Sequence, residues 1–342
     1  MSLHSDLIRI SGCCYIKFKF VLSVYVLQAN PVIETITRSY GLPTKQVHSV
    51  CYANDFIWAA TSNGLARFDG ERIDVFSQKH GLLTHGLRSL SVVKDYLLVC
   101  SDLGLDILCL KTNTILKSVN TVQLGAGWCQ CAQASDADVI YLGCAKGLLS
   151  FCVKTSSIES IMTVPRSPVT HLSRLPSDER LFGVSSHTQC WILDPMSNQA
   201  DMLDKRSYPV QQLSSGYNSY WLVEKHRLLE LDCEGDILRK FTMFHSKADN
   251  IKVLPIDGNK LLIADQNGIA KVEIIEQKLQ VLEKWPVNSL INDFAVDSIG
   301  NIWVATDYAG LKKIPVLQRY VERVSCIEQM TCLCVSQNTT SG

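Results

Sequence analysis

The chain has 342 residues, 46% of them hydrophobic, and it carries 33 basic and 33 acidic side chains, so its formal net charge is zero. This length and apolar content are sufficient for a large buried core. A neutral chain without a run of Lys or Arg lacks the charges that neutralise phosphates, which argues against a nucleic-acid partner.

Residues 1–29 resemble a secretory leader. Lys17 and Lys19 precede an apolar run over 20–27, and Ala29 offers a small side chain at a cleavage position. The run is too short for an ordinary membrane span. We therefore expect export to the periplasm, with an apolar strand as the alternative interpretation of this run.

Residues 34–40 have the form of an outer strand, followed by Gly41-Leu42, but no inner strands precede them. A propeller commonly closes its ring by pairing such a strand with the last blade, which removes two exposed sheet edges. We expect this N-terminal strand to close a ring.

A unit of about forty residues then recurs along the chain. Segment 56–65 (FIWAATSNGL) matches 301–311 (NIWVATDYAGL), and the same outline recurs at 97–105 and around Gly147 and Gly268. Equivalent apolar anchor positions are Trp58, Leu98, Tyr141, Phe182, Trp221, Leu262 and Trp303. Each unit has short runs rich in β-branched and aromatic residues between turn residues, as strands require. The pattern predicts an all-β, seven-bladed β-propeller of four-stranded antiparallel blades, with the anchors between blades.

Asn63-Gly64 and Asn267-Gly268 lie between apolar runs and predict type I′ hairpins, which need positive φ. Blades four and five lack this glycine, so spacing alone assigns them. Residues 329–337 resemble the innermost strand of another repeat. We expect the propeller to occupy 30–320, and 321–342 to begin a further repeat or a linker to a longer polypeptide.

The sequence contains 14 cysteines, which argues for a reducing compartment and opposes the expected export. Most lie in apolar runs and are expected to be small buried hydrophobic residues; they include Cys51, Cys100, Cys109, Cys144 and Cys190. Cys129/Cys131 and Cys332/Cys334 have C-x-C spacing, which on a regular strand places both sulfurs on one face and does not match a zinc knuckle. We expect no metal site and no cofactor.

Segments 57–70 (IWAATSNGLARFDG), 39–43 (SYGLP) and 300–306 (GNIWVAT) resemble the two-component regulator propeller repeat of bacterial sensors, over residues 32–342. In that family the propellers form the periplasmic input region of hybrid histidine kinases and of some diguanylate cyclases, often as two successive discs. The resemblance implies a non-catalytic ligand-sensing input region. It also implies a second propeller or a receptor dimer as partner, and membrane contact only through a span downstream.

The loops between blades, and those joining the second and third strands, gather on one face of a propeller around its channel. We expect ligand contacts there from His80, His85, Trp128, Arg166, Arg206, Tyr208, Lys225, His226, Trp285 and Tyr308. Aromatic and cationic side chains suit stacking on sugars and pairing with carboxylates, so a small-molecule or carbohydrate-like ligand is expected. For Trp128 and Trp285, packing between blades is the alternative.

No catalytic residue is assigned, because the sequence has no G-x-S-x-G, H-E-x-x-H, Walker A or G-x-G-x-x-G motif. His80, His85 and His171 lack the paired spacing of metal ligands. Two other functions stay open. One is an intracellular protein-interaction scaffold, and the other is a propeller lyase or hydrolase with a site mounted on one face.

Overall fold

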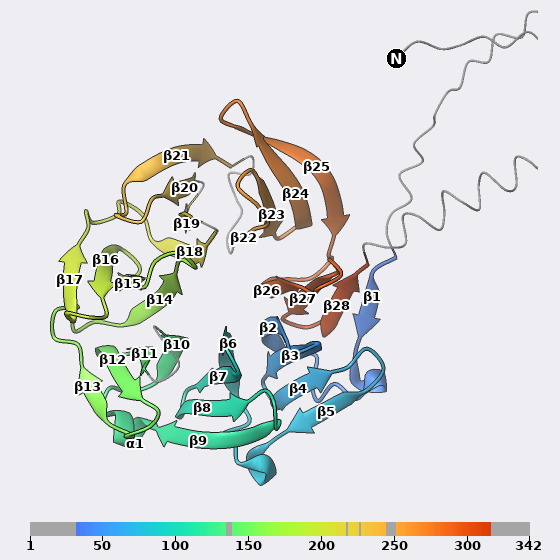
Figure 1. Ribbon diagram of the computed structural model, residues 1–342. Helices are drawn as coiled ribbons and strands as arrows, with labels where there is room; N and C mark the ends of the chain where they lie inside the picture. Colours follow the sequence, from blue (N-terminus) through green and yellow to red (C-terminus); the bar gives the residue numbers. More distant parts are fainter. Residues whose placement is uncertain (1–31, 135–138, 217, 226, 244–250, 316–342) are drawn as a thin grey trace, which may run out of the picture. The chain divides into compact units, whose positions relative to one another are not determined.

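The computed structural model describes residues 32–134, 139–216, 218–225, 227–243 and 251–315. These residues form seven four-stranded antiparallel sheets, arranged as blades around a central channel (Figure 1). The predicted seven-bladed propeller is confirmed, including blades four and five. The predicted leader over 1–29, the continuation over 321–342 and the pair Cys332/Cys334 lie outside the described residues.

Each blade runs outward from the channel in chain order. The innermost strands are β2 (Val47–Ala53), β6 (Leu87–Val93), β10 (Cys129–Ala134), β14 (Val169–Arg174), β18 (Val210–Ser215), β22 (Lys252–Pro255) and β26 (Ile291–Val296). The second strands are β3 (Phe56–Thr61), β7 (Tyr96–Ser101), β11 (Val139–Cys144), β15 (Leu181–Ser185), β19 (Tyr220–Glu224), β23 (Lys260–Asp265) and β27 (Ile302–Thr306). The third strands are β4 (Gly64–Phe68), β8 (Gly104–Cys109), β12 (Gly147–Cys152), β16 (Gln189–Asp194), β20 (Arg227–Leu231), β24 (Gly268–Ile275) and β28 (Leu311–Ile314).

The outer strands complete the blades. They are β5 (Ile73–Phe76), β9 (Thr114–Asn120), β13 (Ile158–Ser160), β17 (Gln199–Met202), β21 (Ile237–Thr242) and β25 (Lys278–Pro286) in blades one to six, and β1 (Glu34–Ile36) in blade seven. Short helical turns connect some blades: 3-10 turns at Arg38–Tyr40 and Gln78–His80, and α1 (Thr121–Leu124).

The N-terminal strand β1 closes the ring, as predicted. It pairs antiparallel with β28, with Glu34 opposite Lys313 and Ile36 opposite Leu311. Ile36 is fully buried. The first described strand therefore belongs to the last blade, and blade seven gains an outer strand that its own repeat does not supply.

The hairpins between second and third strands exist, but the predicted type I′ geometry is wrong. Gly64 and Gly268 have φ of 110° and 140°, whereas the asparagines before them do not have positive φ. The glycine is needed because a Cβ on Gly64 would lie 2.6 Å from the carbonyl oxygen of Phe76 on the outer strand. A left-handed pair occurs instead at Asn54 and Asp55, with φ of 51° and 63°, between β2 and β3.

The core lies between blades. Each of the seven hydrophobic clusters in the described residues joins two neighbouring blades, and the anchor side chains belong to them. No anchor is more than 3% exposed. The blades therefore adhere through side-chain packing rather than through shared sheets, as the placement of the anchors predicted.

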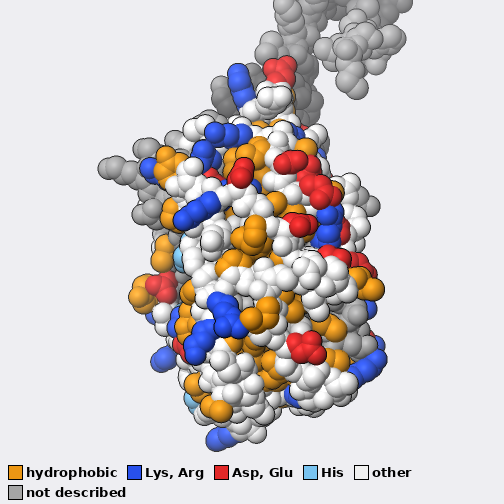
Figure 2. All heavy atoms as spheres, turned by 90° about the vertical axis from the view of Figure 1, so that its left-hand side faces the viewer, with side chains coloured by type: hydrophobic (Ala, Val, Ile, Leu, Met, Phe, Trp, Pro, Cys, Tyr) orange, Lys and Arg blue, Asp and Glu red, His pale blue; other side chains and the backbone are white. Residues whose placement is uncertain are grey.

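The rim around blade four carries acidic and basic side chains interspersed with apolar ones (Figure 2). Neither sign of charge forms a stripe on the described surface seen in this view. This side of the propeller lacks the basic footprint of a nucleic-acid-binding surface.

Candidate functional site

The two faces of the propeller carry different loops. Every innermost strand runs from the face where the chain arrives from the preceding blade, which we call the connection face, to the opposite face. Because neighbouring strands are antiparallel, the turns between second and third strands also lie on the connection face. The turns between first and second strands lie on the opposite face.

The structure brings three of the predicted ligand residues together in blade five. Arg206 and Tyr208 lie in the connection between β17 and β18, and Lys225 lies in the turn after β19. The Lys225 Nζ and the Arg227 guanidinium each lie 4.8 Å from the centre of the Tyr208 ring. The ring therefore orients two cations at the surface.

A buried carboxylate lies next to the two arginines of this cluster. Glu224 is 1% exposed, and its carboxylate lies 2.5 Å from Arg227 Nη2 and 3.9 Å from Arg206 Nε. Among the described residues, neither Arg206 Nε nor Arg227 Nε has a hydrogen-bond partner. We call Arg206, Tyr208, Glu224, Lys225 and Arg227 the blade-five cluster. With three cations and one carboxylate, it is net positive and suited to an anionic group.

The remaining predicted residues are dispersed. His80 accepts a hydrogen bond at Nδ1 from the backbone N–H of Ser77 at 3.0 Å, and so caps the 3-10 turn at Gln78–His80. Exposed side chains on other blades include His85, Trp128, Arg166 and Tyr308. His226 lies outside the described residues. Trp285 is 6% exposed and packs between blades six and seven.

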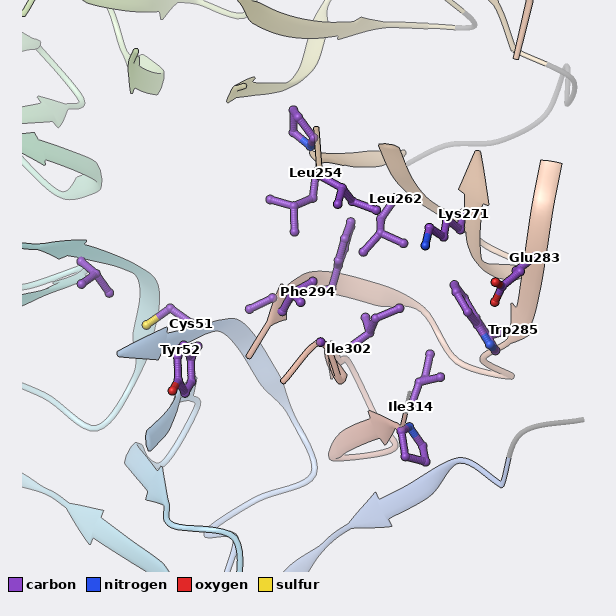
Figure 3. Close-up of a pocket in the computed structure, with 17 residues that line it drawn as sticks. Cys51, Tyr52, Leu254, Leu262, Lys271, Glu283, Trp285, Phe294, Ile302 and Ile314 are labelled. Atoms are coloured by element: carbon purple, nitrogen blue, oxygen red, sulfur yellow. The ribbon is translucent and has the colours of Figure 1, made fainter. Parts of the chain in front are cut away.

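Blades six and seven enclose a cavity of about 680 Å³. Leu254 and Leu262 line it from blade six, and Phe294, Ile302 and Ile314 line it from blade seven (Figure 3). Tyr52, near the end of β2, and Val92, near the end of β6, line the side of the cavity next to the central channel. Because these strands end on the opposite face, the cavity lies away from the blade-five cluster, and Trp285 is the predicted ligand residue that lines it.

The inner strand of blade six is short because it starts late, not because it ends early. β22 has four residues, whereas the other innermost strands have six or seven. Its last residue, Pro255, lies opposite the residue before the anchor Leu262, which is where four of the other inner strands also end. Ile256, 47% exposed, then starts the turn beside the cavity. Sequence reasoning did not predict this cavity, although it named Trp285, which lines it, as a ligand residue.

The outer end of the cavity carries two opposite charges. Lys271 on β24 and Glu283 on β25 are direct cross-strand partners, so their side chains share one face of the sheet. Both line the cavity, next to the Trp285 ring (Figure 3). The cavity is thus apolar along its length and polar at one end.

A ring of polar side chains lines the innermost strands. In each blade, one residue of the innermost strand pairs with the second-strand residue that lies two positions after the anchor. These innermost residues are Ser49, Ser89, Cys131, His171, Gln212, Lys252 and Asp293. We call them the inner ring. In six of the seven blades the ring residue follows a β-bulge in the inner strand, and β22 is the blade whose pairing has no such shift.

The inner ring joins blades by hydrogen bonds. Ser49 Oγ donates to Asp293 Oδ2 at 2.7 Å across blades one and seven, and His171 Nε2 donates to the Gln211 carbonyl oxygen at 3.2 Å across blades four and five. Gln212 Nε2 donates to the Val253 carbonyl oxygen at 3.1 Å across blades five and six. Similar bonds cross the remaining seams except one.

The exception is the seam between blades six and seven. Within the described residues, no hydrogen bond joins the Lys252 side chain to blade seven. Burial lowers the pKa of Lys252, although Asp293 opposes this shift, and burial raises the pKa of Asp293 against the hydrogen bond from Ser49. The seam that lacks a ring hydrogen bond is also the seam that holds the cavity.

The described cysteines pack within and between blades. Among the described residues, no group of three or more His, Cys, Asp or Glu side chains has metal-binding geometry. Cys100, Cys144 and Cys190 are buried as predicted, whereas Cys51 and Cys109 are half-buried. The expectation that Cys129 and Cys131 share a face is wrong, because a bulge separates them. Cys129 Sγ lies 3.4 Å from Cys100 Sγ in blade two, and Cys131 Sγ donates to the Val169 carbonyl in blade four.

Fold and site thus define a seven-bladed β-propeller with a cationic cluster on one face and an apolar cavity at the other. No family model matches the chain, and no curated protein matches it in sequence. Solved structures do match it in fold. One is the extracellular domain of a protein described as a hybrid two-component system from B. thetaiotaomicron, with a TM-score of 0.64 and 17% identity. The match covers 83% of this chain and 42% of that one, so this chain spans less than half of that domain.

Two further structures have the same fold. The extracellular domain of a protein described as a one-component system from B. thetaiotaomicron matches with a TM-score of 0.65 and 18% identity, over 83% of this chain and 40% of that chain. A streptogramin B lyase matches with a TM-score of 0.68 and 14% identity, over 83% of this chain and 97% of that chain. Extracellular domains of two-component and one-component systems and an enzyme therefore share this architecture, and fold alone does not choose between them. In the described part of this chain, no helix has the length and apolar character of a membrane span.

Proposed function

We propose that this propeller is a non-catalytic ligand-sensing domain, the periplasmic input region of a bacterial two-component or cyclic-di-GMP signalling receptor. The repeat phrases around Trp58 and Trp303 support this proposal, and so does a fold shared with extracellular domains of two such systems. A second propeller or a receptor dimer would be its partner. Any membrane span would lie downstream of this chain.

The blade-five cluster is the observation that carries the proposal. Its cations surround Tyr208 on the connection face, where propeller loops meet their ligands. Because two cations already lie against the Tyr208 ring, recognition depends on charge rather than on free aromatic stacking. The ligand is therefore an acidic, carbohydrate-like molecule whose carboxylate or sulfate pairs with Lys225 and Arg227.

Binding of acidic and neutral oligosaccharides of equal length to the full chain tests this function by calorimetry. We expect acidic oligosaccharides to bind, and Lys225→Ala to weaken that binding by about tenfold, or about 1.4 kcal/mol. Lys284→Ala, an exposed lysine on the outer strand of blade six, is the matched control and should change affinity little. Equal binding of neutral and acidic sugars, or equal effects of the two variants, would contradict the proposal.

The enzyme alternative is tested with the same samples. A sensing domain returns its ligand unchanged, whereas a lyase or hydrolase consumes it. Mass spectrometry of the oligosaccharide after prolonged incubation should show only the starting material. Shortened or unsaturated products that depend on the protein would replace the sensing function with a catalytic one.

A further inference from the structure

We propose that the cavity between blades six and seven is a second binding site, for a largely apolar, uncharged small molecule with a polar group at one end. This inference goes beyond the proposed function, because it concerns another face of the propeller and another ligand chemistry. It stands or fails independently of the blade-five cluster.

The size and lining of the cavity define the class of ligand. A cavity of about 680 Å³ lies within the range of small-molecule sites, about 300–1,000 Å³. Aromatic rings from both blades, Trp285 and Phe294, lie along it, together with branched aliphatic side chains such as Leu254 (Figure 3). A flat, apolar molecule inserted between the blades would be covered on two sides and would bury most of its surface.

The two charges at the outer end specify the polar group. Because Lys271 and Glu283 are direct cross-strand partners, a ligand carboxylate near Lys271 would also approach Glu283, and a ligand ammonium would approach Lys271. A neutral hydroxyl or amide can instead accept from the lysine and donate to the glutamate. The pair thus selects an uncharged head over either ion.

The seam can admit a ligand because it is the one held least firmly by the inner ring. Ring side chains reach across the other six seams, but in the described residues Lys252 forms no hydrogen bond to blade seven. Pro255 and Ile256, at and after the end of β22, line the cavity on the side of the opposite face. A ligand there would add packing contacts between the two blades.

A neutral fluorescent probe, N-phenyl-1-naphthylamine, tests the site in the full chain. We expect saturable binding of one probe per chain, about tenfold tighter than that of the anionic probe 1-anilinonaphthalene-8-sulfonate. Leu254→Trp should fill the cavity and weaken probe binding by about tenfold or more. Ile256→Trp narrows the mouth at a partly exposed position and should act in the same direction without a large loss of stability.

The matched control is Leu238→Trp, a 55% exposed leucine on β21 of blade five, which should leave probe affinity unchanged. Lys225→Ala should also leave it unchanged, which separates this site from the blade-five cluster. Photolysis with benzophenone, followed by peptide mass spectrometry, should label residues of β22, β25 or β26.

Three outcomes would overturn the proposal. The first is labelling confined to other surfaces, and the second is a probe affinity that Ile256→Trp and Leu238→Trp change equally. The third is the absence of saturable binding.

Discussion

Gly183 is kept free of a side chain by Trp191. The two residues are cross-strand partners on β15 and β16, and a Cβ on Gly183 would overlap the Trp191 ring. Trp191 is fully buried, and its Nε1 donates to Ser185 Oγ at 2.9 Å, so the ring cannot move aside without losing a buried hydrogen bond. Blade four thus carries its tryptophan on the third strand, whereas blades one, five and seven carry it on the second.

We therefore expect Gly183→Ala to lower the free energy of unfolding by about 1–3 kcal/mol, the usual cost of overpacking a core. Gly258→Ala is the matched control, because Gly258 has negative φ and no atom within 4 Å of an added Cβ. Its effect should be small or slightly stabilising. Urea denaturation measures both changes, and equal losses in the two variants would contradict the role assigned to Trp191.

At the scale of elements, β1 closes the ring with three residues. Ile36 supplies most of its packing, because it is fully buried while Thr35 is exposed. Gly310 has to be small here, since its Cβ would lie 2.5 Å from the Ile36 carbonyl oxygen. A short strand thus joins the two ends of the ring mainly through one side chain.

Ile36→Ala should destabilise the propeller by about 2–5 kcal/mol, through lost burial and a residual cavity. Thr35→Ala, on the solvent side of the same strand, should change stability by less than about 0.5 kcal/mol. Thermal and urea unfolding measure both. If Ile36→Ala had no larger effect than Thr35→Ala, ring closure by β1 would contribute little to stability.

The elements also show what the sequence could predict. Anchor spacing identified all seven blades, because each anchor fills the same inter-blade position and tolerates few substitutes. Register assigned Arg206, Tyr208 and Lys225 to the connection face, but it did not predict that they meet there. Glu224 and Arg227 were missed because they lie at strand ends. The repeat pattern predicts a structural role for strand residues rather than ligand contact. The cavity was missed because it depends on how side chains of blades six and seven pack against each other, which no local pattern encodes.

At the scale of the molecule, seven separate sheets act as one body because packing and the inner ring link each blade to the next. His171 is the histidine of the inner ring, and it would gain a proton between neutral and mildly acidic pH only in the unfolded chain. Its ring nitrogens lie 3.0 Å from Thr170 Oγ1 and 3.2 Å from the Gln211 carbonyl oxygen. Burial, with a smaller effect from Lys252 and His187, lowers the pKa of His171 from 6.5 to about 4.

A lowered pKa in the folded state means that the native propeller favours neutral His171. The corresponding stability is fully present above the unfolded pKa of 6.5 and is lost as the pH falls from there toward 4. Between pH 7 and pH 5 we expect this one group to remove about 1–2 kcal/mol from the free energy of unfolding.

His171→Gln can still donate to Gln211 but has no charge to acquire, so its stability should fall less over the same interval. His85→Gln, at an exposed histidine, should keep the wild-type pH dependence. Urea denaturation of the three proteins at both pH values compares the slopes, which removes the contribution of the carboxylates common to all. Equal slopes for wild type and His171→Gln would mean that protonation of the inner ring does not limit the stability of the propeller in mild acid.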